Sequence, residues 1–414
     1  MRQYKDSGTQ GIGLIPQSWD SKQLGVFFSE NRKANSYLES ITALQFKYGE
    51  IIQKPNNGRD LSDKDKDLLS KYTVIEPGDV VVNGLNLNFD LKSLRIAIAR
   101  ENGIITSAYI VLRPRKGVNS EYYNYVLKAL DFQKILHGMG EGIRLTLNYD
   151  ELKKLIVPAP ETAIQSAIVS YLDSKCGEID SLIALQEHMI EKLKAYKQSV
   201  ITEAVTKGLS PNTKLFPSGI DWIGEIPESW EVCRFKSYIH LISEKSVETT
   251  GIKVNLENIE SKSGRYIPTD SKYEGDGTSF KKGDVLFGKL RPYLAKVLAP
   301  EFDGAAIGDI YVFRPTDRIN TCFLKYMLLS DTFITIVDSS TYGTKMPRAN
   351  WEFISCVPVV VPSLDEQRVI VSFLDEKCVE IDRLLDLKRQ KIDKLKNYKK
   401  SVIYEAVTGK TIIE

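Results

Sequence analysis

The chain carries one long internal repeat, and this repeat limits the folds that are open to it. Residues 171–208 align without a gap with residues 373–410, and 22 of the 38 aligned positions are identical. A second matching pair opens each half, SGTQGIGLIPQSW from Ser7 and SGIDWIGEIPESW from Ser218. Repeats of about 20–50 residues would indicate a solenoid. A single duplication spaced about 200 residues apart instead predicts two large variable domains held on two matching helices.

Both copies of the repeat have the periodicity of a long amphipathic helix. Gly208 and Gly409 are typical helix ends, and Ser363 to Glu366 has the pattern of a capping box. Apolar residues recur at steps of four and three, with one interruption in each copy, at Leu172, Cys176, Ile179, Ile183, Ile190, Leu193 and Val200 and at Leu374, Cys378, Ile381, Leu385, Ile392, Leu395 and Val402.

Such a helix needs a partner for its apolar stripe. About 40 residues of helix span about 60 Å, and the obvious partner for each stripe is the other copy. Antiparallel pairing is favoured, because a two-fold operation between similar halves satisfies both stripes alike. The alternative is that each helix packs only on its own domain.

The C-terminal ends of the two helices remain nearly identical in sequence, SVITEAVT and SVIYEAVT. One interpretation is packing inside the coiled coil, and the other is a docking surface present twice for two copies of one partner. The candidate partner-binding residues are Tyr196, Val200 and Ala204 in the first copy and Tyr398, Val402 and Ala406 in the second.

The two variable regions, residues 20–157 and 231–357, read mainly as short strands bounded by Gly, Pro and Asn. Helical patterns cover residues 120–137 and 322–337. Matching segments follow in the same order in both regions, for example PGDVVVNGLNLN with KGDVLFGKLRPY and TSAYIVLRP with GDIYVFRP. We therefore expect an α+β protein with two mixed α/β domains of one fold, two long antiparallel coiled-coil helices and a pseudo-two-fold internal repeat.

Two sets of loops in these domains carry side chains suited to DNA. Arg and Lys reach guanine edges or phosphates, and Asn pairs with adenine through two hydrogen bonds. The same residue types also occur in loops for turn formation and solvation. The candidate DNA-binding residues are Asn83, Asn86, Asn88, Arg95, Arg144 and Asn148 in the first domain and Lys289, Arg291, Lys345, Arg348 and Asn350 in the second.

Composition narrows the class of protein further. A chain of 414 residues with 42% hydrophobic and 9% aromatic residues fits two to four folded domains. The net charge is only +2, so any DNA affinity must come from local clusters or be shared with a partner. We expect no signal peptide and no membrane span. Five scattered cysteines and three histidines predict free thiols in the cytoplasm and no zinc site.

Motifs for catalysis are missing from the sequence. The chain has no Asn/Asp-Pro-Pro-aromatic tetrapeptide of DNA amino-methyltransferases and no GxxxxGK[ST] phosphate loop. The glycine-rich segment 138–142 follows a helical pattern rather than a strand, which argues against a cofactor loop. The hypotheses that remain are a DNA-reading protein without an active site of its own, a coiled-coil scaffold without specific DNA readout, and a DNA-modifying enzyme with an unfamiliar site.

Three segments together resemble the specificity subunit of type I restriction–modification systems. They are SGIDWIGEIPESWE, GDVLFGKLRPYLAKV and VPSLDEQRVIVSFLDEKCVEIDRLL, and the resemblance extends over nearly the whole chain. The first half departs from it, because Gly11 stands where the second half has Trp222 and the acidic residue at Glu366 has no counterpart. The resemblance implies a target-recognition domain over 1–157, a conserved helix over 158–208, a second recognition domain over 209–360 and a second conserved helix over 361–414.

The resemblance also implies a function in DNA recognition together with partner subunits. Each domain would read one half of a bipartite, asymmetric site on double-stranded DNA. The helices would set the gap between the half-sites and bind two modification subunits that methylate adenine. S-adenosylmethionine would belong to those subunits, and ATP and magnesium to restriction subunits where these are present. The chain itself would hold no cofactor or metal and carry no catalytic residue.

Overall fold

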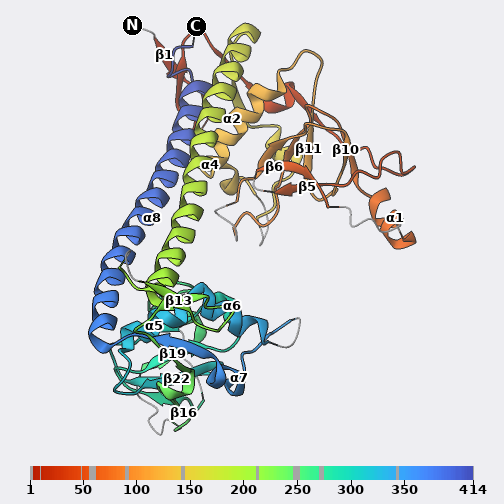
Figure 1. Cartoon of the computed structure of the whole chain (residues 1–414). Helices are drawn as coiled ribbons and strands as arrows, with labels where there is room; N and C mark the ends of the chain where they lie inside the picture. Colours follow the sequence, from red (N-terminus) through yellow and green to blue (C-terminus); the bar gives the residue numbers. More distant parts are fainter. Residues whose placement is uncertain are drawn as a thin grey trace. The chain divides into compact units, whose positions relative to one another are not determined.

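The computed structural model (Figure 1) describes residues 3–9, 11–47, 49–55, 62–88, 93–140, 145–210, 214–245, 252–269, 275–341 and 345–413. By its internal contacts the chain divides into two compact units. The first unit contains Met1–Leu185 and Lys391–Glu414, and the second contains Gln186–Gln390. Each unit therefore combines one variable domain with a part of both long helices, and each is described by itself below.

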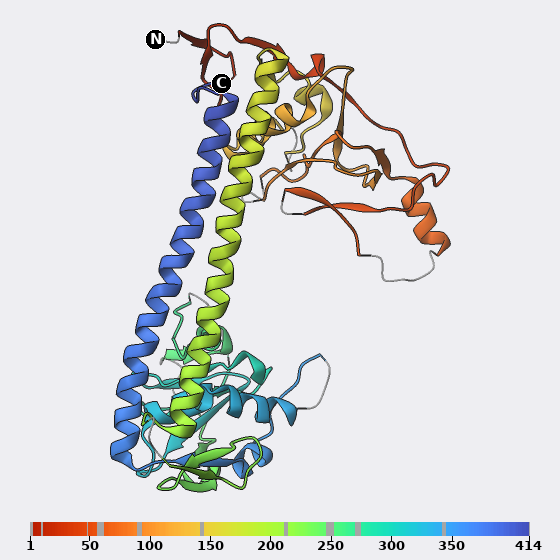
Figure 2. The same ribbon diagram turned by 45° about the horizontal axis from the view of Figure 1, so that its top comes forward.

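The two copies of the repeat form helices α4 (Thr162–Lys207) and α8 (Leu364–Val407). Within each unit the two helices lie side by side, as both views show (Figures 1 and 2). In the first unit Lys399 Nζ lies 2.7 Å from the Asp180 carboxylate, and in the second Lys197 Nζ lies 2.8 Å from the Asp382 carboxylate. The four residues occupy matching positions in the repeat, so each unit contains the same cross-link between the helices.

The direction of the pairing follows from the contacts on either side of these ion pairs. In the first unit Leu172 and Cys176, before Asp180 in α4, share a core with residues that follow Lys399 in α8. In the second unit Gly208, after Lys197 in α4, lies beside Glu366, which precedes Asp382 in α8. Residue numbers thus rise along one helix as they fall along the other, which confirms the predicted antiparallel pairing.

The variable domain of the first unit is built around a four-stranded antiparallel sheet. Its order is β4 (Phe28–Glu30), β11 (Ile110–Pro114), β8 (Val80–Val82) and β9 (Ile96–Ile98), and α2 (Ser120–Phe132) packs against it. Two-stranded sheets surround it: β1 (Tyr4–Asp6) with β2 (Leu14–Pro16), β3 (Asp20–Gln23) with β12 (Ile156–Ala159), β5 (Leu44–Lys47) with β6 (Glu50–Gln53), and β7 (Thr73–Ile75) with β10 (Gly103–Ile105). The same domain contains two short helices, α1 (Asp63–Ser70) and α3 (Tyr149–Leu152).

The second unit repeats this plan. Its central antiparallel sheet has the order β16 (Ile239–Ile242), β22 (Ile310–Pro315), β19 (Val285–Gly288) and β20 (Val297–Leu298). Around it lie the pairs β13 (Leu215–Pro217) with β14 (Glu225–Pro227) and β15 (Glu231–Arg234) with β23 (Pro358–Val361). The helices are α5 (Thr321–Leu329), α6 (Asp331–Ser339) and α7 (Trp351–Cys356). Corresponding strands therefore occur in the same order in both units, which confirms the shared fold.

The domains differ outside this common sheet. The second unit has a three-stranded sheet in which β17 (Ile252–Val254) pairs in parallel with β21 (Gly304–Ala306), and β18 (Thr278–Phe280) pairs antiparallel with β21. The helix predicted over residues 322–337 is also two helices, α5 and α6. Ser330 separates them with an extended backbone, and its hydroxyl caps α6 by accepting from the Phe333 N–H.

A buried ion pair explains why both domains contain Gly-Asp before a strand and Arg-Pro at the end of another. The Asp79 carboxylate accepts from Nε and Nη2 of Arg113 at 3.0 and 2.8 Å. Asp284 accepts from the same atoms of Arg314 at 2.7 and 2.8 Å. Both aspartates are almost fully buried. The pair connects β8 to β11 and β19 to β22 across the centre of each sheet.

The hairpin motif that opens each half covers the end of one long helix. In the first unit Ile15 of the hairpin shares a core with Ala406, and the Tyr404 hydroxyl donates to the Ile12 carbonyl at 2.8 Å. In the second unit Ile226 and Trp230 share a core with Ala204. The near-identical helix ends therefore meet near-identical hairpins, and this packing accounts for much of their similarity.

Candidate nucleic-acid interface

The second unit brings its candidate DNA-binding residues onto one surface. Leu290 and Arg348 form an isolated β-bridge, the Arg291 N–H donates to the Pro347 carbonyl at 2.8 Å, and the Ala349 N–H donates to the Lys289 carbonyl at 2.8 Å. The loop after β19 is thereby joined to the segment before α7. We call the residues placed here the second loop platform, namely Lys289, Arg291, Lys345, Arg348 and Asn350.

The first unit contains the same arrangement with different side chains. The Leu147 N–H donates to the Gly84 carbonyl at 2.9 Å, and the Leu87 N–H donates to the Leu145 carbonyl at 3.1 Å. The span from Gly84 to Leu87 is one residue longer than the matching span from Lys289 to Arg291. The first loop platform consists of Asn83, Asn86, Asn88 and Asn148. Arg144 lies outside the described residues, as do Glu141 and Gly142 of the glycine-rich segment.

Asparagines shape the backbone of both platforms. Asn148 and Asn350 occupy matching positions and cap α3 and α7, accepting from the N–H groups of Glu151 and Glu352. Asn86 adopts the left-handed backbone conformation with φ of 51°, which Asn tolerates better than most residues. Asn86, Asn88, Asn148 and Asn350 are nevertheless exposed. Turn formation, the alternative considered from the sequence, therefore explains part of their occurrence.

Arg95 was predicted to contact DNA, and its position in the structure contradicts this. The residue is 2% exposed. Its Nη1 donates to the carbonyls of Leu85 and Asn83 at 2.7 and 3.2 Å, and its Nη2 donates to the Asn86 carbonyl at 3.4 Å. Its own N–H donates to the Asp131 carboxylate at 2.7 Å. Arg95 therefore holds the first loop platform from beneath, and we do not retain it as a DNA contact.

The second unit has a partly buried cation at the matching position. Lys296 Nζ donates to the carbonyls of Leu256 and Ile259 at 2.6 and 2.8 Å, and burial lowers the pKa of this ammonium. Sequence inspection did not single it out. The signal that could have found it is its alignment with Arg95, because both residues directly precede the fourth strand of the central sheet.

The second loop platform also contains an acid that sequence inspection missed. Arg348 binds the Asp309 carboxylate through Nε, 3.1 Å from both oxygens, and through Nη2 at 3.0 Å. Lys289 Nζ lies 3.8 Å from the same carboxylate and 5.3 Å from the centre of the Tyr311 ring. The hydrogen bond and charge of Asp309 raise the pKa of Arg348. Arg291 projects from a left-handed backbone conformation with φ of 51°.

The candidate partner-binding residues divide into exposed and buried groups. Tyr196 and Tyr398 are 56% and 57% exposed, and Val200 is half-buried. Ala204, Val402 and Ala406 are buried against the hairpins and domain cores. They cannot contact a partner in this conformation, so for these three residues the packing interpretation replaces the docking one.

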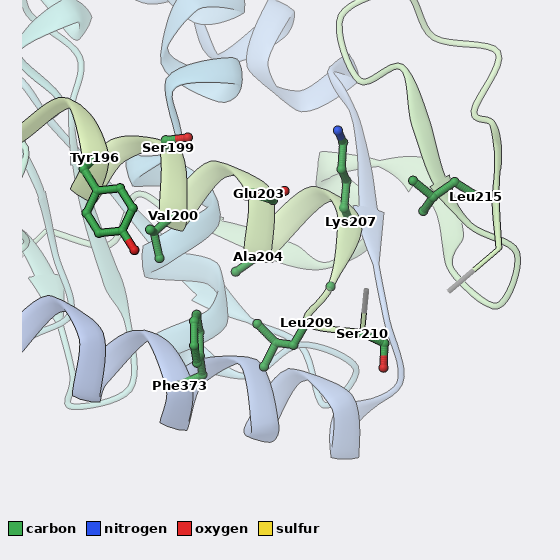
Figure 3. A pocket seen from close by; sticks show the side chains of 11 residues that line it. Tyr196, Ser199, Val200, Glu203, Ala204, Lys207, Leu209, Ser210, Leu215 and Phe373 are labelled. Carbon is green, nitrogen blue, oxygen red and sulfur yellow. The ribbon is translucent and has the colours of Figure 1, made fainter. Parts of the chain in front are cut away.

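A cavity of about 470 Å³ lies beside the exposed group in the second unit. Figure 3 shows Tyr196, Val200 and Ala204 of α4 along one side and Phe373 of α8 facing them. Leu209 and Leu215 extend the lining beyond the end of α4. A partner side chain could enter this cavity next to Tyr196.

Over the part of the chain that the structure describes, no helix is both long and apolar enough to cross a membrane. Within the same residues, no group of three His, Cys, Asp or Glu side chains could hold a metal ion. The five cysteines are free thiols, and burial raises the pKa of Cys176, Cys322 and Cys378.

Comparison with known proteins finds relatives of this chain in one family. Residues 229–397 match the type I restriction modification DNA specificity domain. The chain is 25% identical over 315 residues to the type I restriction enzyme EcoDI specificity subunit of Escherichia coli, covering 70% of each protein. It is 24% identical over 365 residues to the MjaVIII specificity subunit of Methanocaldococcus jannaschii, covering 83% of each.

A solved structure supports the fold. One chain of a structure described as "Structural basis underlying complex assembly and conformational transition of the type I R-M system" matches with a TM-score of 0.68 and 15% identity, covering 95% of this chain and 98% of the other. The matched domain, residues 229–397, is the DNA specificity domain of type I restriction–modification systems. The chain is similar in sequence and fold to the specificity subunits of these systems, which confirms the resemblance found in its sequence.

Proposed function

We propose that each variable domain reads one half of a bipartite, asymmetric site on double-stranded DNA. The observation that supports this most directly is the pair of loop platforms. Both are built by the same two backbone hydrogen bonds, yet the described residues of the first present asparagines, whereas the second presents arginines and lysines beside Asn350. Because these residue types prefer different base edges, one fold used twice would recognise two different sequences.

The paired helices would set the gap between the half-sites and bind two modification subunits. Tyr196 with its cavity and the matching Tyr398 support two similar docking sites. The methylation chemistry, with S-adenosylmethionine, would take place on the modification subunits in the cytoplasm. Restriction subunits, where the system has them, would supply ATP-driven cleavage with magnesium. The specificity subunit would carry no catalytic residue of its own.

Exchange of residues 20–157 for the matching region of another specificity subunit tests this function. The chain would be produced together with its modification subunits, and modified adenines would be mapped by single-molecule sequencing of the host DNA. We expect one half-site to change while the other half-site and the gap stay the same.

Two results would contradict the proposal. If both half-sites changed together, the domains would not read DNA independently. If the complex of the unaltered chain marked no split site and left no split footprint, the chain would be a scaffold without specific DNA readout.

A further inference from the structure

The second loop platform contains an acidic side chain among its cations. Asp309 lies immediately before β22, and its side chain is 23% exposed. Its carboxylate contacts Arg348 at 3.0–3.1 Å and Lys289 at 3.8 Å. An acid is unfavourable on a surface that only attracts phosphates, because it cancels part of the positive charge. Its presence therefore calls for an explanation beyond attraction to the DNA backbone.

The geometry of the Arg348–Asp309 pair suggests what the acid does. The carboxylate lies against the Nε side of the guanidinium and occupies Nε–H and Nη2. A guanidinium has five N–H donors in one plane, so its Nη1 group and the second Nη2 hydrogen form the opposite edge. Those donors point in parallel directions, as recognition by two hydrogen bonds requires. The side chain is 54% exposed, so this edge is open to a ligand.

The position of the guanidinium is restricted at both ends. The Arg348 backbone pairs with Leu290 in a β-bridge, which fixes its Cα relative to the loop after β19. Asp309 binds the far end of the side chain. Asp309 is itself held by its place immediately before β22 and by Lys289. An arginine held in this way loses little rotamer freedom on binding, which favours specific recognition over flexible phosphate contact.

We propose that Arg348, oriented by Asp309, reads a guanine in the half-site recognised by the second variable domain. The O6 and N7 atoms of guanine accept the two parallel hydrogen bonds that the outer edge of Arg348 offers. Asp309 is a positioning residue that acts through Arg348. This inference rests on the proposed function and adds to it the identity of one base and the residue that reads it.

The first domain provides an internal comparison. Alignment of TSAYIVLRP with GDIYVFRP places Ala108 at the position of Asp309. The first loop platform thus has no acid there, and its exposed side chains are asparagines. Among the residues that the structure describes, this arginine–aspartate pair occurs in the second domain, so a change to it should alter only one of the two half-sites.

Two substitutions test the inference in the complex with modification subunits. Arg348→Lys keeps the charge but removes the planar pair of donors. Asp309→Asn removes the carboxylate with little change in size. The control is Glu301→Gln, which removes an exposed acid of the same unit whose partner is Lys282. Modified adenines are mapped by single-molecule sequencing, DNA binding is measured on oligonucleotides that differ at one base pair, and thermal unfolding checks the fold.

We expect Arg348→Lys to reduce discrimination at one G·C pair of a single half-site by about tenfold to a hundredfold. Asp309→Asn should reduce discrimination at that pair by about tenfold while binding to unrelated DNA stays equal or increases, because a negative charge is lost. The Glu301→Gln complex should keep the original recognition sequence.

The inference would be overturned if Arg348→Lys weakened binding to all sequences equally, because that result would identify a phosphate contact. It would also be overturned if both variants recognised the unaltered sequence with unaltered preference. Should Asp309→Asn fail to assemble, Arg348→Lys alone decides. A wild-type complex that marks no bipartite site would instead refute the proposed function, so the two failures are distinguishable.

Discussion

Arg95 shows how a buried residue can hold in place a loop that is proposed to bind DNA. Its guanidinium joins three consecutive parts of the first loop platform through the carbonyls of Asn83, Leu85 and Asn86. Hydrogen bonds from a charged donor contribute more than neutral ones, about 1.5–3 kcal/mol each. The Asn86 backbone lies in the left-handed conformation, which Asn adopts more readily than most residues, and its carbonyl is one of the three that Arg95 holds.

We predict that Arg95→Met destabilises the first unit by about 2–4 kcal/mol, because the loop carbonyls lose their charged donor. The matched control is Arg100→Met, since Arg100 is mostly exposed and pairs with Glu121 at the surface, and we expect it to change stability by less than about 1 kcal/mol. Hydrogen–deuterium exchange of residues 83–88 would show the loss of order in the loop. Equal protection of this loop in both variants would contradict the positioning role.

Sequence patterns could not have distinguished Arg95 from a DNA contact. An arginine in a polar loop has the same local signature whether its side chain points outward or inward, and here the guanidinium binds carbonyls of the folded loop 83–86, whose shape the sequence does not reveal. Asp309 was also missed, because Arg348, which it binds, is distant from it along the chain.

Trp230 is a residue for which a difference between the two halves was visible in the sequence. The sequence showed that Glu366 has no counterpart in the first half, and the structure shows the consequence: Trp230 Nε1 donates to Glu366 at 3.1 Å, whereas the buried Trp19 Nε1 has no hydrogen-bond partner among the described residues.

At the scale of elements, the two helix cross-links form a natural pair for comparison. Lys197 and Asp382 occupy the same repeat positions as Lys399 and Asp180, but their side chains are 9% and 25% exposed against 29% and 56%. Removal of one partner from a buried pair leaves an uncompensated charge and is strongly destabilising, whereas exposed pairs contribute little. The same substitution in the two ion pairs should therefore lower the stability of the two units by different amounts.

We predict that Asp382→Asn destabilises the second unit by about 2–4 kcal/mol, while Asp180→Asn destabilises the first unit by at most about 1 kcal/mol. Since a chain with two units need not unfold in one step, the measurement should be local. Hydrogen–deuterium exchange would follow residues 186–207 for the first variant and residues 391–407 for the second. Similar loss of protection in both variants would show that burial does not control the strength of these pairs.

Elements were predicted more reliably than their side-chain roles. The stripe on each long helix could be read from the sequence because its period is repeated over many turns, and residues such as Leu172 and Leu374 are indeed fully buried. The break at Ser330 was not predicted, because apolar residues such as Leu329 before it and Phe333 after it continue a helical pattern. The roles of Ala204, Val402 and Ala406 were open, since an apolar helix face is equally suited to a hairpin of the same chain and to a partner.

At the scale of the whole molecule, the length of the repeated helices should determine the gap between half-sites. Both helices contribute to both units, so neither can be shortened alone without losing the matching of their apolar stripes. Removal of seven residues from each helix keeps the stripes in phase, because seven residues complete about two turns. Residues 182–188 and 384–390 occupy matching repeat positions and lie between the two helix cross-links.

We predict that the double deletion of 182–188 and 384–390 shortens the gap by about two to three base pairs and leaves both half-sites unchanged. Seven helical residues span about 10 Å, and base pairs stack about 3.4 Å apart, so a helix inclined to the DNA axis removes up to three steps. Mapping of modified adenines in cells producing the shortened chain with its modification subunits would measure the new gap directly. Deletion from one helix only is the control, and it should abolish modification because the stripes no longer meet in register. If the double deletion retained the original gap, the DNA spacing would be set within the variable domains or by the modification subunits, and the helices would serve only to join the two halves.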